Sequence, residues 1–197
     1  MKSLVVATRN EGKHKELRRL LGRGARGIRL LCLNDFPGAP DVKETARTLE
    51  GNAALKAKSA AKFTGKPAFA DDSGLFVNAL GGKPGVKSAR YAGPKQDSVA
   101  NRRKLLKEMA GKKMRGAAFR CAVALATPEG KTAFARGIVR GRIIFEERGS
   151  HGFGYDSVFV PCGYGKTFAE LGPRVKDRIS HRTRALRRIL PAVRRLV

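Results

Sequence analysis

The sequence predicts an α/β protein in which a mixed central sheet is flanked by helices. Short apolar runs alternate with helical patterns over the first 70 residues, and two longer apolar runs around the turn 128–130 indicate a hairpin. A basic amphipathic helix ends the chain. A length of 197 residues suits one domain with two lobes around a cleft, and residues 115–165, roughly, are expected to form a β-rich lobe.

The first half of the chain is expected to contain alternating strands and helices. An apolar, β-branched run over 4–7 predicts a strand, and leucines at helical spacing predict a helix over 15–21. The further elements expected are a strand over 28–33, a loop over 34–43, a helix over 48–63, a strand ending at Asp71, a glycine-rich loop over 74–93 and a helix from 97 or 98 to 109.

The second half is expected to be richer in strands. The elements expected are strands over 117–127, 131–139 and 141–146, a loop over 151–156, a short strand over 158–160 and a final helix over 175–196. Together the two halves predict a mixed sheet, because a strand–helix alternation favours parallel pairing and a hairpin is antiparallel.

The charge of the chain is extreme. Lys and Arg number 42 against 16 Asp and Glu, a net charge of +26. Such a field attracts polyanions, so phosphate-bearing substrates and non-specific nucleic-acid adhesion are both expected, although a solvated basic surface is the simpler alternative. Three scattered cysteines, no signal peptide and no apolar run of membrane-spanning length favour a cytoplasmic protein with reduced thiols.

Asp71 and Asp72 are the strongest chemical signal. They follow the apolar run 66–70 and are followed by Ser73 and Gly74. Two adjacent carboxylates beside a buried strand need a counter-charge, since an unpaired buried charge is very costly. Oxygen ligands suit Mg²⁺, so this tetrapeptide predicts metal-assisted phosphate chemistry. The alternative is an exposed turn whose carboxylates cap a helix.

Further candidates have weaker signals. The loop 8–13 lies between a strand and a helix, where backbone N–H groups attract phosphate. Glu44 lies in a polar loop and would join Asp72 on the metal, while Lys56 would face either phosphate or solvent. The loop 153–156 combines two aromatic rings with an acid, an arrangement suited to a nucleobase or simply to a core bend. Arg182 favours a carbonyl or phosphate contact.

Taken together, these motifs resemble those of the non-canonical purine nucleoside triphosphate pyrophosphatases, the inosine triphosphatase or RdgB/Ham1-like family. The segments that carry the resemblance run in order over almost the whole chain: 5–13, 52–56, 70–75, 79–85, 88–91, 152–156 and 179–182. The resemblance implies a Mg²⁺-dependent homodimer with a two-lobed fold that hydrolyses ITP, dITP and XTP to the monophosphate and pyrophosphate.

The resemblance also implies roles for individual residues. Glu44 and Asp72 would bind the metal, with Asp72 also the general base, and Ser73 would contact substrate. The triphosphate and its surroundings would be held by Thr8, Arg9, Asn10, Glu11, Gly12, Lys13 and Lys56. The base pocket would consist of Phe153, Gly154, Tyr155, Asp156, Lys176, His181 and Arg182.

The chain departs from the family pattern at two positions. Gly51 stands where relatives often carry an acid, which is expected to soften its helix, and Ser157 stands where they usually carry proline, which is expected to free the loop that reads the base. Two other functions stay open. One is a Maf-type pyrophosphatase that acts on other modified nucleotides, and the other is a basic nucleic-acid-binding protein with a vestigial site.

Overall fold

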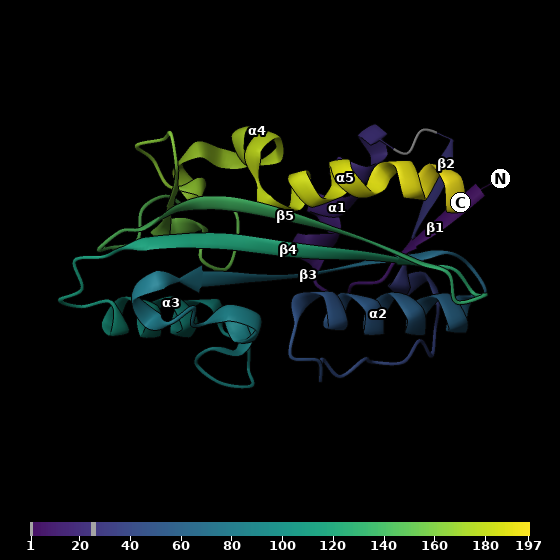
Figure 1. The fold of residues 1–197 in the computed structure, drawn as a ribbon, viewed down its shortest axis with the longest axis horizontal. Coiled ribbons are helices and arrows are strands. Elements are labelled where there is room, and N and C mark those ends of the chain that lie inside the picture. Colours follow the sequence, from purple (N-terminus) through teal and green to yellow (C-terminus); the bar gives the residue numbers. More distant parts are fainter. Residues whose placement is uncertain (1, 25–26) are drawn as a thin grey trace. The chain divides into compact units, whose positions relative to one another are not determined.

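The fold was described from a computed structural model that covers residues 2–24 and 27–197. Figure 1 shows its helices and strands. These are β1 (Lys2–Val6), α1 (Glu11–Gly24), β2 (Ile28–Cys32), α2 (Leu49–Thr64), β3 (Ala68–Val77), α3 (Ser98–Glu108), β4 (Gly116–Ala126), β5 (Thr132–Ile143), β6 (Phe159–Pro161), α4 (Phe168–Ile179) and α5 (His181–Leu196).

The strands form one sheet in the order β2-β1-β3-β4-β5-β6. β1 pairs in parallel with both β2 and β3, whereas β5 and β6 are antiparallel. The predicted mixed sheet with flanking helices is therefore confirmed. Within the described residues, no helix is long and apolar enough to cross a membrane.

The chain divides into two compact units, each assembled from separate segments. Unit 1 consists of Met1–Asp72, Cys121–Gly137 and Arg182–Val197, and unit 2 of Ser73–Arg120 and Ile138–His181. β3, β4 and β5 each contribute residues to both units. The stretch 115–165, expected to form a β-rich lobe, is thus divided between the two.

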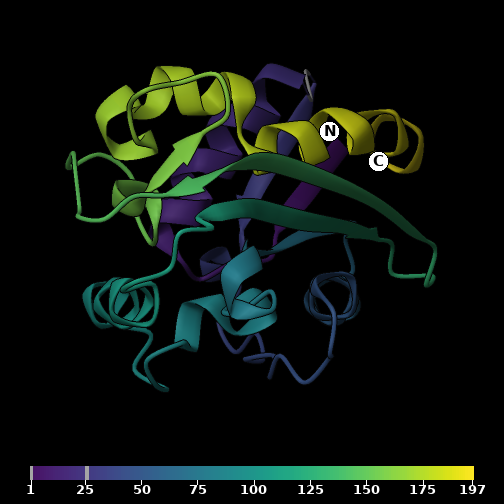
Figure 2. The same cartoon turned by 60° about the vertical axis from the view of Figure 1, so that its left-hand side comes forward.

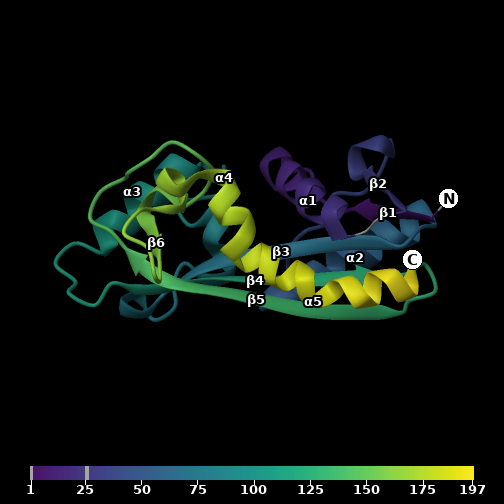
Figure 3. The same cartoon turned by 90° about the horizontal axis from the view of Figure 1, so that it is seen from above.

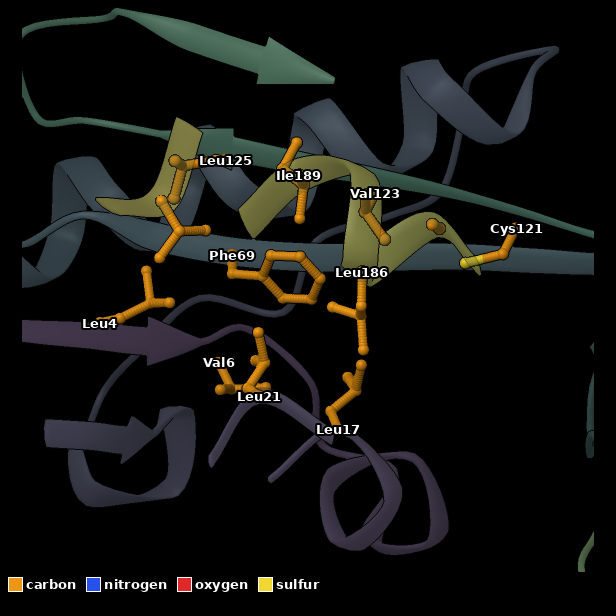
Figure 4. Close-up of a cluster of buried hydrophobic side chains, with 12 residues drawn as sticks. Leu4, Val6, Leu17, Leu21, Phe69, Cys121, Val123, Leu125, Leu186 and Ile189 are labelled. Atoms are coloured by element: carbon orange, nitrogen blue, oxygen red, sulfur yellow. The ribbon is translucent and has the colours of Figure 1, made fainter. Parts of the chain in front are cut away.

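Unit 1 has a helix layer on each face of its strands, because side chains alternate along a strand. Leu4 and Val6 of β1 join a core cluster with α1 and α5, and Val5 and Ala7 join a second cluster with α2. Figures 1 and 2 show α5 and α2 on opposite sides of the strands of this unit, and Figure 3 looks onto the α5 side. The first cluster contains Phe69, Leu17 and Leu186 (Figure 4).

α2 packs closely because its buried positions are small. Ala53, Ala57, Ala60 and Ala61 recur at helical spacing and are at most 4% exposed. The helix begins after Thr48, whose hydroxyl accepts a hydrogen bond from a backbone N–H of the first turn. This rigid helix carries polar side chains that reach β3, described below.

Unit 2 is built around aromatic residues. Phe119 packs edge-on against Phe159 at 4.7 Å between ring centroids and stacks on His181 at 4.9 Å. α3 contributes Leu105 and Met109 to the same core. α3 begins after Asp97, whose carboxylate accepts from two backbone N–H groups, so the predicted start of this helix is confirmed.

Three predicted boundaries were wrong. β3 does not end at Asp71 but continues to Val77, into the segment expected to be a loop, where Phe76 forms a β-bridge with Pro84 and the backbone N–H of Val77 donates to the carbonyl of Lys83 at 3.2 Å. The strands expected over 131–139 and 141–146 are the single strand β5. The final helix is two helices, α4 and α5, separated by Ser180 in an extended conformation (φ −64°, ψ 159°).

Candidate active site

Unit 1 contains a cluster of carboxylates around one lysine. The Nζ of Lys56 lies 2.8 Å from Oε1 of Glu44 and 3.7 Å from Oδ1 of Asp72. The amide of Asn52 donates to the other oxygen of Asp72 at 3.1 Å. Asn52 and Lys56 are one turn apart on α2 and therefore share a helix face. The structure thus brings Glu44 and Asp72, predicted as the two metal ligands, to the same ammonium group.

Asp71 belongs to a second cluster. Its Oδ2 accepts from Nε of Arg182 at 3.0 Å and lies 3.7 Å from Nζ of Lys13. Arg182 also donates from a terminal nitrogen to Glu16 at 2.6 Å. Asp71 and Asp72 point to opposite faces of β3, since successive side chains of a strand alternate. Arg182 contacts Asp71 and Asn52 contacts Asp72, so both carboxylates have polar partners although they are only 2% and 4% exposed.

The two neighbouring carboxylates differ in proton affinity. Burial raises the pKa of Asp72, and the charge of Glu44 adds to this, so its pKa lies above the ordinary value despite Lys56 and Lys13. Burial also acts to raise the pKa of Asp71, but Lys13, Arg182 and Lys56 together outweigh it, and its pKa is lowered. Asp72 is therefore the better proton acceptor of the two.

The donor set fits a hard divalent cation. Among residues 2–24 and 27–197, no group of three or more His, Cys, Asp or Glu side chains is arranged to hold a metal ion by itself. Two carboxylates are nevertheless what Mg²⁺ usually takes from a protein, with substrate oxygens and water completing its shell. Burial, and to a smaller extent the charge of Glu44, raises the pKa of Asp72, and a bound cation would stabilise both carboxylates in their charged form.

The loop before α1 is ordered by its own side chains. The hydroxyl of Thr8 accepts from the backbone N–H of Asn10 at 3.2 Å, and Oδ1 of Asn10 accepts from the backbone N–H of Lys13 at 2.9 Å. Asn10 is therefore the N-cap of α1. The cap leaves the side chain of Lys13, which is 20% exposed, directed to Asp71.

The loop 8–13 contains three further residues that were predicted to bind substrate, Arg9, Glu11 and Gly12. Arg9 donates to the carbonyl of Ala39 at 2.5 Å, which fastens the loop to the segment before α2. Gly12 is exposed. The side chain of Glu11 lies outside what the structure describes.

A second group of predicted residues lies in unit 2. Nζ of Lys176 lies 2.6 Å from Oδ2 of Asp156 and 4.6 Å from the centroid of the Phe153 ring. The same carboxylate oxygen accepts from the backbone N–H of Phe153 at 2.9 Å. The hydroxyl of Tyr155 donates to the carbonyl of Ser88 at 2.8 Å. This group offers a buried donor next to a buried acceptor, with an aromatic face beside them.

The two adjacent residues His181 and Arg182 fall in different units. His181 is stacked on Phe119 in unit 2, whereas the guanidinium of Arg182 lies with Glu16 and Asp71 in unit 1. Arg182, which the resemblance assigns to the base pocket, donates to the carboxylates of Glu16 and Asp71, and its role toward the base stays a prediction. Ser73 is half-buried in β3, directly after Asp72.

Sequence reasoning missed three residues that bind predicted site residues or their neighbours, two in unit 1 and one in unit 2. Asn52 was noted only as part of a motif, although it binds Asp72. Glu16 is a buried acid within the leucine-rich pattern of α1, a position that could have marked it as the partner of a buried cation. Glu147 of unit 2 carried no sequence signal.

The chain was compared with known proteins. The sequence model of the Ham1 family matches residues 4–192. The chain belongs to the Ham1 family. A relative from Geobacillus kaustophilus named dITP/XTP pyrophosphatase is 48% identical over 191 residues, covering 96% of this chain and 93% of that protein. Another of that name from Geobacter sulfurreducens is 49% identical over 188 residues, covering 94% of both.

Solved structures of Ham1 family members have the same fold. A HAM1 protein from Coxiella burnetii matches with a TM-score of 0.89 and 38% identity, covering 99% of this chain and 100% of that one. A structure from Mycobacterium abscessus, described as a nucleoside-triphosphatase or dITP/XTP pyrophosphatase, matches with a TM-score of 0.77 and 45% identity, covering 96% and 99%. The predicted family and fold class are thereby confirmed.

Proposed function

We propose that this Ham1 family protein hydrolyses the non-canonical purine nucleoside triphosphates ITP, dITP and XTP to the monophosphate and pyrophosphate. The observation that carries the proposal is the convergence of Glu44 and Asp72 on Lys56, with Asp71 held next to them in β3. Carboxylates for a metal and lysines for phosphate oxygens are thereby collected in one compact unit. The names of the relatives support the same reaction.

The roles of the residues follow from their surroundings. Glu44 and Asp72 would hold Mg²⁺, which when bound neutralises charge on the triphosphate. Asp72, whose pKa is raised by burial and by Glu44, would take the proton of the water that attacks the α-phosphorus. Lys13 and Lys56 would supply positive charge to the departing pyrophosphate. Asn52 would keep the carboxylate of Asp72 in one orientation through its hydrogen bond.

Phe153, Asp156 and Lys176 of unit 2 would recognise the purine base. A 6-keto purine presents a carbonyl acceptor next to a ring N–H donor, and Lys176 and Asp156 present the matching donor and acceptor. Adenine presents the reverse pattern, so its 6-amino group would face the ammonium of Lys176 and its N1 acceptor would face the carboxylate of Asp156, which is unfavourable. Phe153 would stack on the ring.

Pyrophosphate release from a panel of nucleoside triphosphates, measured with and without Mg²⁺, tests this proposal. We expect a much higher kcat/KM for ITP, dITP and XTP than for ATP, and no release without the metal. Equal rates on ATP would refute the base-reading role. Preference for methylated pyrimidine nucleotides would instead favour the Maf-type alternative.

We further propose that the enzyme is a cytoplasmic homodimer. Free Cys32, Cys121 and Cys162 are consistent with a reducing compartment. Sedimentation equilibrium of the purified chain tests the oligomeric state, and a single species of monomer mass would contradict the dimer.

A second candidate function, adhesion to nucleic acid, is favoured by the outer face of α5. The sixteen residues of this helix include no acid, and five of its arginines are exposed at helical spacing. This arginine stripe consists of Arg184, Arg187, Arg188, Arg194 and Arg195. α1, whose leucines share the core of α5, adds the exposed residues Lys15, Arg18 and Arg19. Neither helix contains Phe, Tyr or Trp, and the ring of His181 is buried against Phe119, so duplex backbone suits this face better than single strands.

Adhesion is tested by the salt dependence of duplex binding. The variant Arg187→Gln/Arg195→Gln should reduce the slope of log K against log[salt] by about 2, since each phosphate contact contributes about 1. The control Lys112→Gln/Lys113→Gln removes the same charge from exposed positions of unit 2. Equal slopes for the two variants would show that only net charge matters, and the arginine stripe would then have no special role.

A further inference from the structure

Residues 152–157 form a loop, called here the base-recognition loop, that carries Phe153 and Asp156. Its geometry depends on glycine. Gly152 and Gly154 both have positive φ angles, +84° and +63°, and a Cβ on Gly152 would lie 2.1 Å from a carboxylate oxygen of Asp156. Because glycine has more conformational freedom to lose than any other residue, this loop requires restraint from outside to hold one conformation.

Besides the contacts of Tyr155 and Asp156 described above, part of that restraint comes from one carboxylate oxygen of Glu147. Oε2 of Glu147 accepts from Nε of Arg102 at 2.7 Å and from the hydroxyl of Ser157 at 3.0 Å. Arg102, on α3, also donates from Nη1 to the carbonyl of Gly154 at 3.0 Å. Arg102 therefore joins a rigid helix to the middle of the loop, and Glu147 joins it to the end of the loop.

We propose that Glu147, Arg102 and Ser157 form a clamp that positions the base-recognition loop and so sets the affinity for the purine base. The inference rests on the proposed function, since it assigns the clamp to the same base site. Ser157 was expected to leave the loop freer than proline would. Its hydroxyl instead has a charged partner, and its carbonyl accepts from the backbone N–H of Arg148 at 2.9 Å.

The clamp acts on binding rather than on the bond that breaks. None of the three clamp side chains is assigned to the metal, to the attacking water or to the departing pyrophosphate. Phe153 and Asp156 lie on either side of Gly154, so a free Gly154 carbonyl would let both move relative to Lys176. Loss of the clamp should therefore raise KM and leave kcat nearly unchanged. The side chain of Glu147 is 35% exposed, so its pair with Arg102 contributes little to global stability.

Glu147→Ala is the test, and Glu146→Ala is its matched control, because Glu146 is the same residue one position earlier and is exposed. Amide hydrogen exchange of residues 152–157 is measured without substrate, and kcat and KM are measured with ITP and XTP. We expect exchange and KM to rise about tenfold for Glu147→Ala, the factor that corresponds to one charge-assisted hydrogen bond. Ser157→Ala should give a smaller rise, since Arg102 still reaches Gly154.

The outcomes separate the clamp from the proposed function. Equal exchange in the Glu147→Ala and Glu146→Ala proteins would overturn the clamp, whatever the activity. Faster exchange with an unchanged KM would overturn its role in base affinity. If the wild-type protein did not hydrolyse ITP and XTP, the proposed function would be overturned, and with it the role of the clamp in base affinity. The exchange data would still decide whether the clamp exists. In the double variant Glu147→Ala/Arg102→Gln, the increases in exchange rate and in KM should be far smaller than the sum expected from the two single variants, because both changes release the same loop.

Discussion

Asp71 and Asp72 are neighbours in β3, but replacing each by asparagine should affect stability in opposite ways. Asp71 is fully buried between Lys13 and Arg182, and removing one partner of a buried ion pair costs about 3–5 kcal/mol. Arg182 keeps Glu16 as a partner, which places Asp71→Asn at the lower end, about 3 kcal/mol. For a chain of this size that corresponds to a fall in Tm of about 6–12 °C.

Asp72→Asn should not lower stability. The pKa of Asp72 is raised by burial and by Glu44, so the folded protein disfavours its charged form at pH 7. Asparagine removes that charge, and Lys56 retains Glu44 at 2.8 Å. Activity should nevertheless fall by about 10²–10⁴-fold, the usual contribution of a positioned base.

The pH dependence follows from the same two shifts. The pKa of Asp71 is lowered on folding, so its stabilisation is present above its unfolded pKa of about 3.9 and is lost as the pH falls below that value. The deficit of Asp71→Asn relative to wild type should therefore shrink below about pH 4. The pKa of Asp72 is shifted the other way, so the advantage of Asp72→Asn should grow as the pH rises above about 4, the unfolded pKa, and through the raised pKa of the folded protein.

Urea unfolding between pH 3 and 7 in the presence of a chelator measures both effects without metal, and pyrophosphate release measures activity. The reasoning would be refuted if Asp71→Asn were as stable as wild type at pH 7. It would equally be refuted if both variants lost the same stability, because the carboxylates would then share one environment.

Three further predictions concern close packing and the metal. Gly74→Ala should lower the free energy of unfolding by about 1–3 kcal/mol, because its Cβ would lie 2.2 Å from the carbonyl oxygen of Gly85. An unchanged midpoint of urea unfolding would contradict that contact. Alanine in place of glycine usually stabilises a helix by roughly 1 kcal/mol, but Gly51→Ala should not, since its Cβ would lie 2.6 Å from the Cβ of Ala46. A clear rise in Tm would show that this contact relaxes. A chelator should stop pyrophosphate release but leave the circular dichroism spectrum unchanged, because Asp72 already has a hydrogen-bond partner in the protein, Asn52, when no metal is bound. Unfolding on addition of the chelator would instead indicate a structural metal.

Much of the fold follows from local patterns. The apolar, β-branched run over 4–7 and the alanine spacing of α2 are local patterns, and the structure has a strand and a helix at these places. Thr48 and Asp97 mark helix starts because a side-chain oxygen caps the first turn of its own helix. The end of β3 was predicted wrongly, since its last residues pair with backbone further along the chain, at Lys83 and Pro84.

The sequence by itself determined the family, the mixed sheet and the acidic residues expected to bind a cation, because these depend on residue types and their order along the chain. Only the tertiary structure decided which cation neutralises which carboxylate. Arg182 lies 111 residues from Asp71 along the chain, yet its guanidinium binds that carboxylate. The partner of a buried charge is set by which elements pack together, and the local sequence does not carry that information.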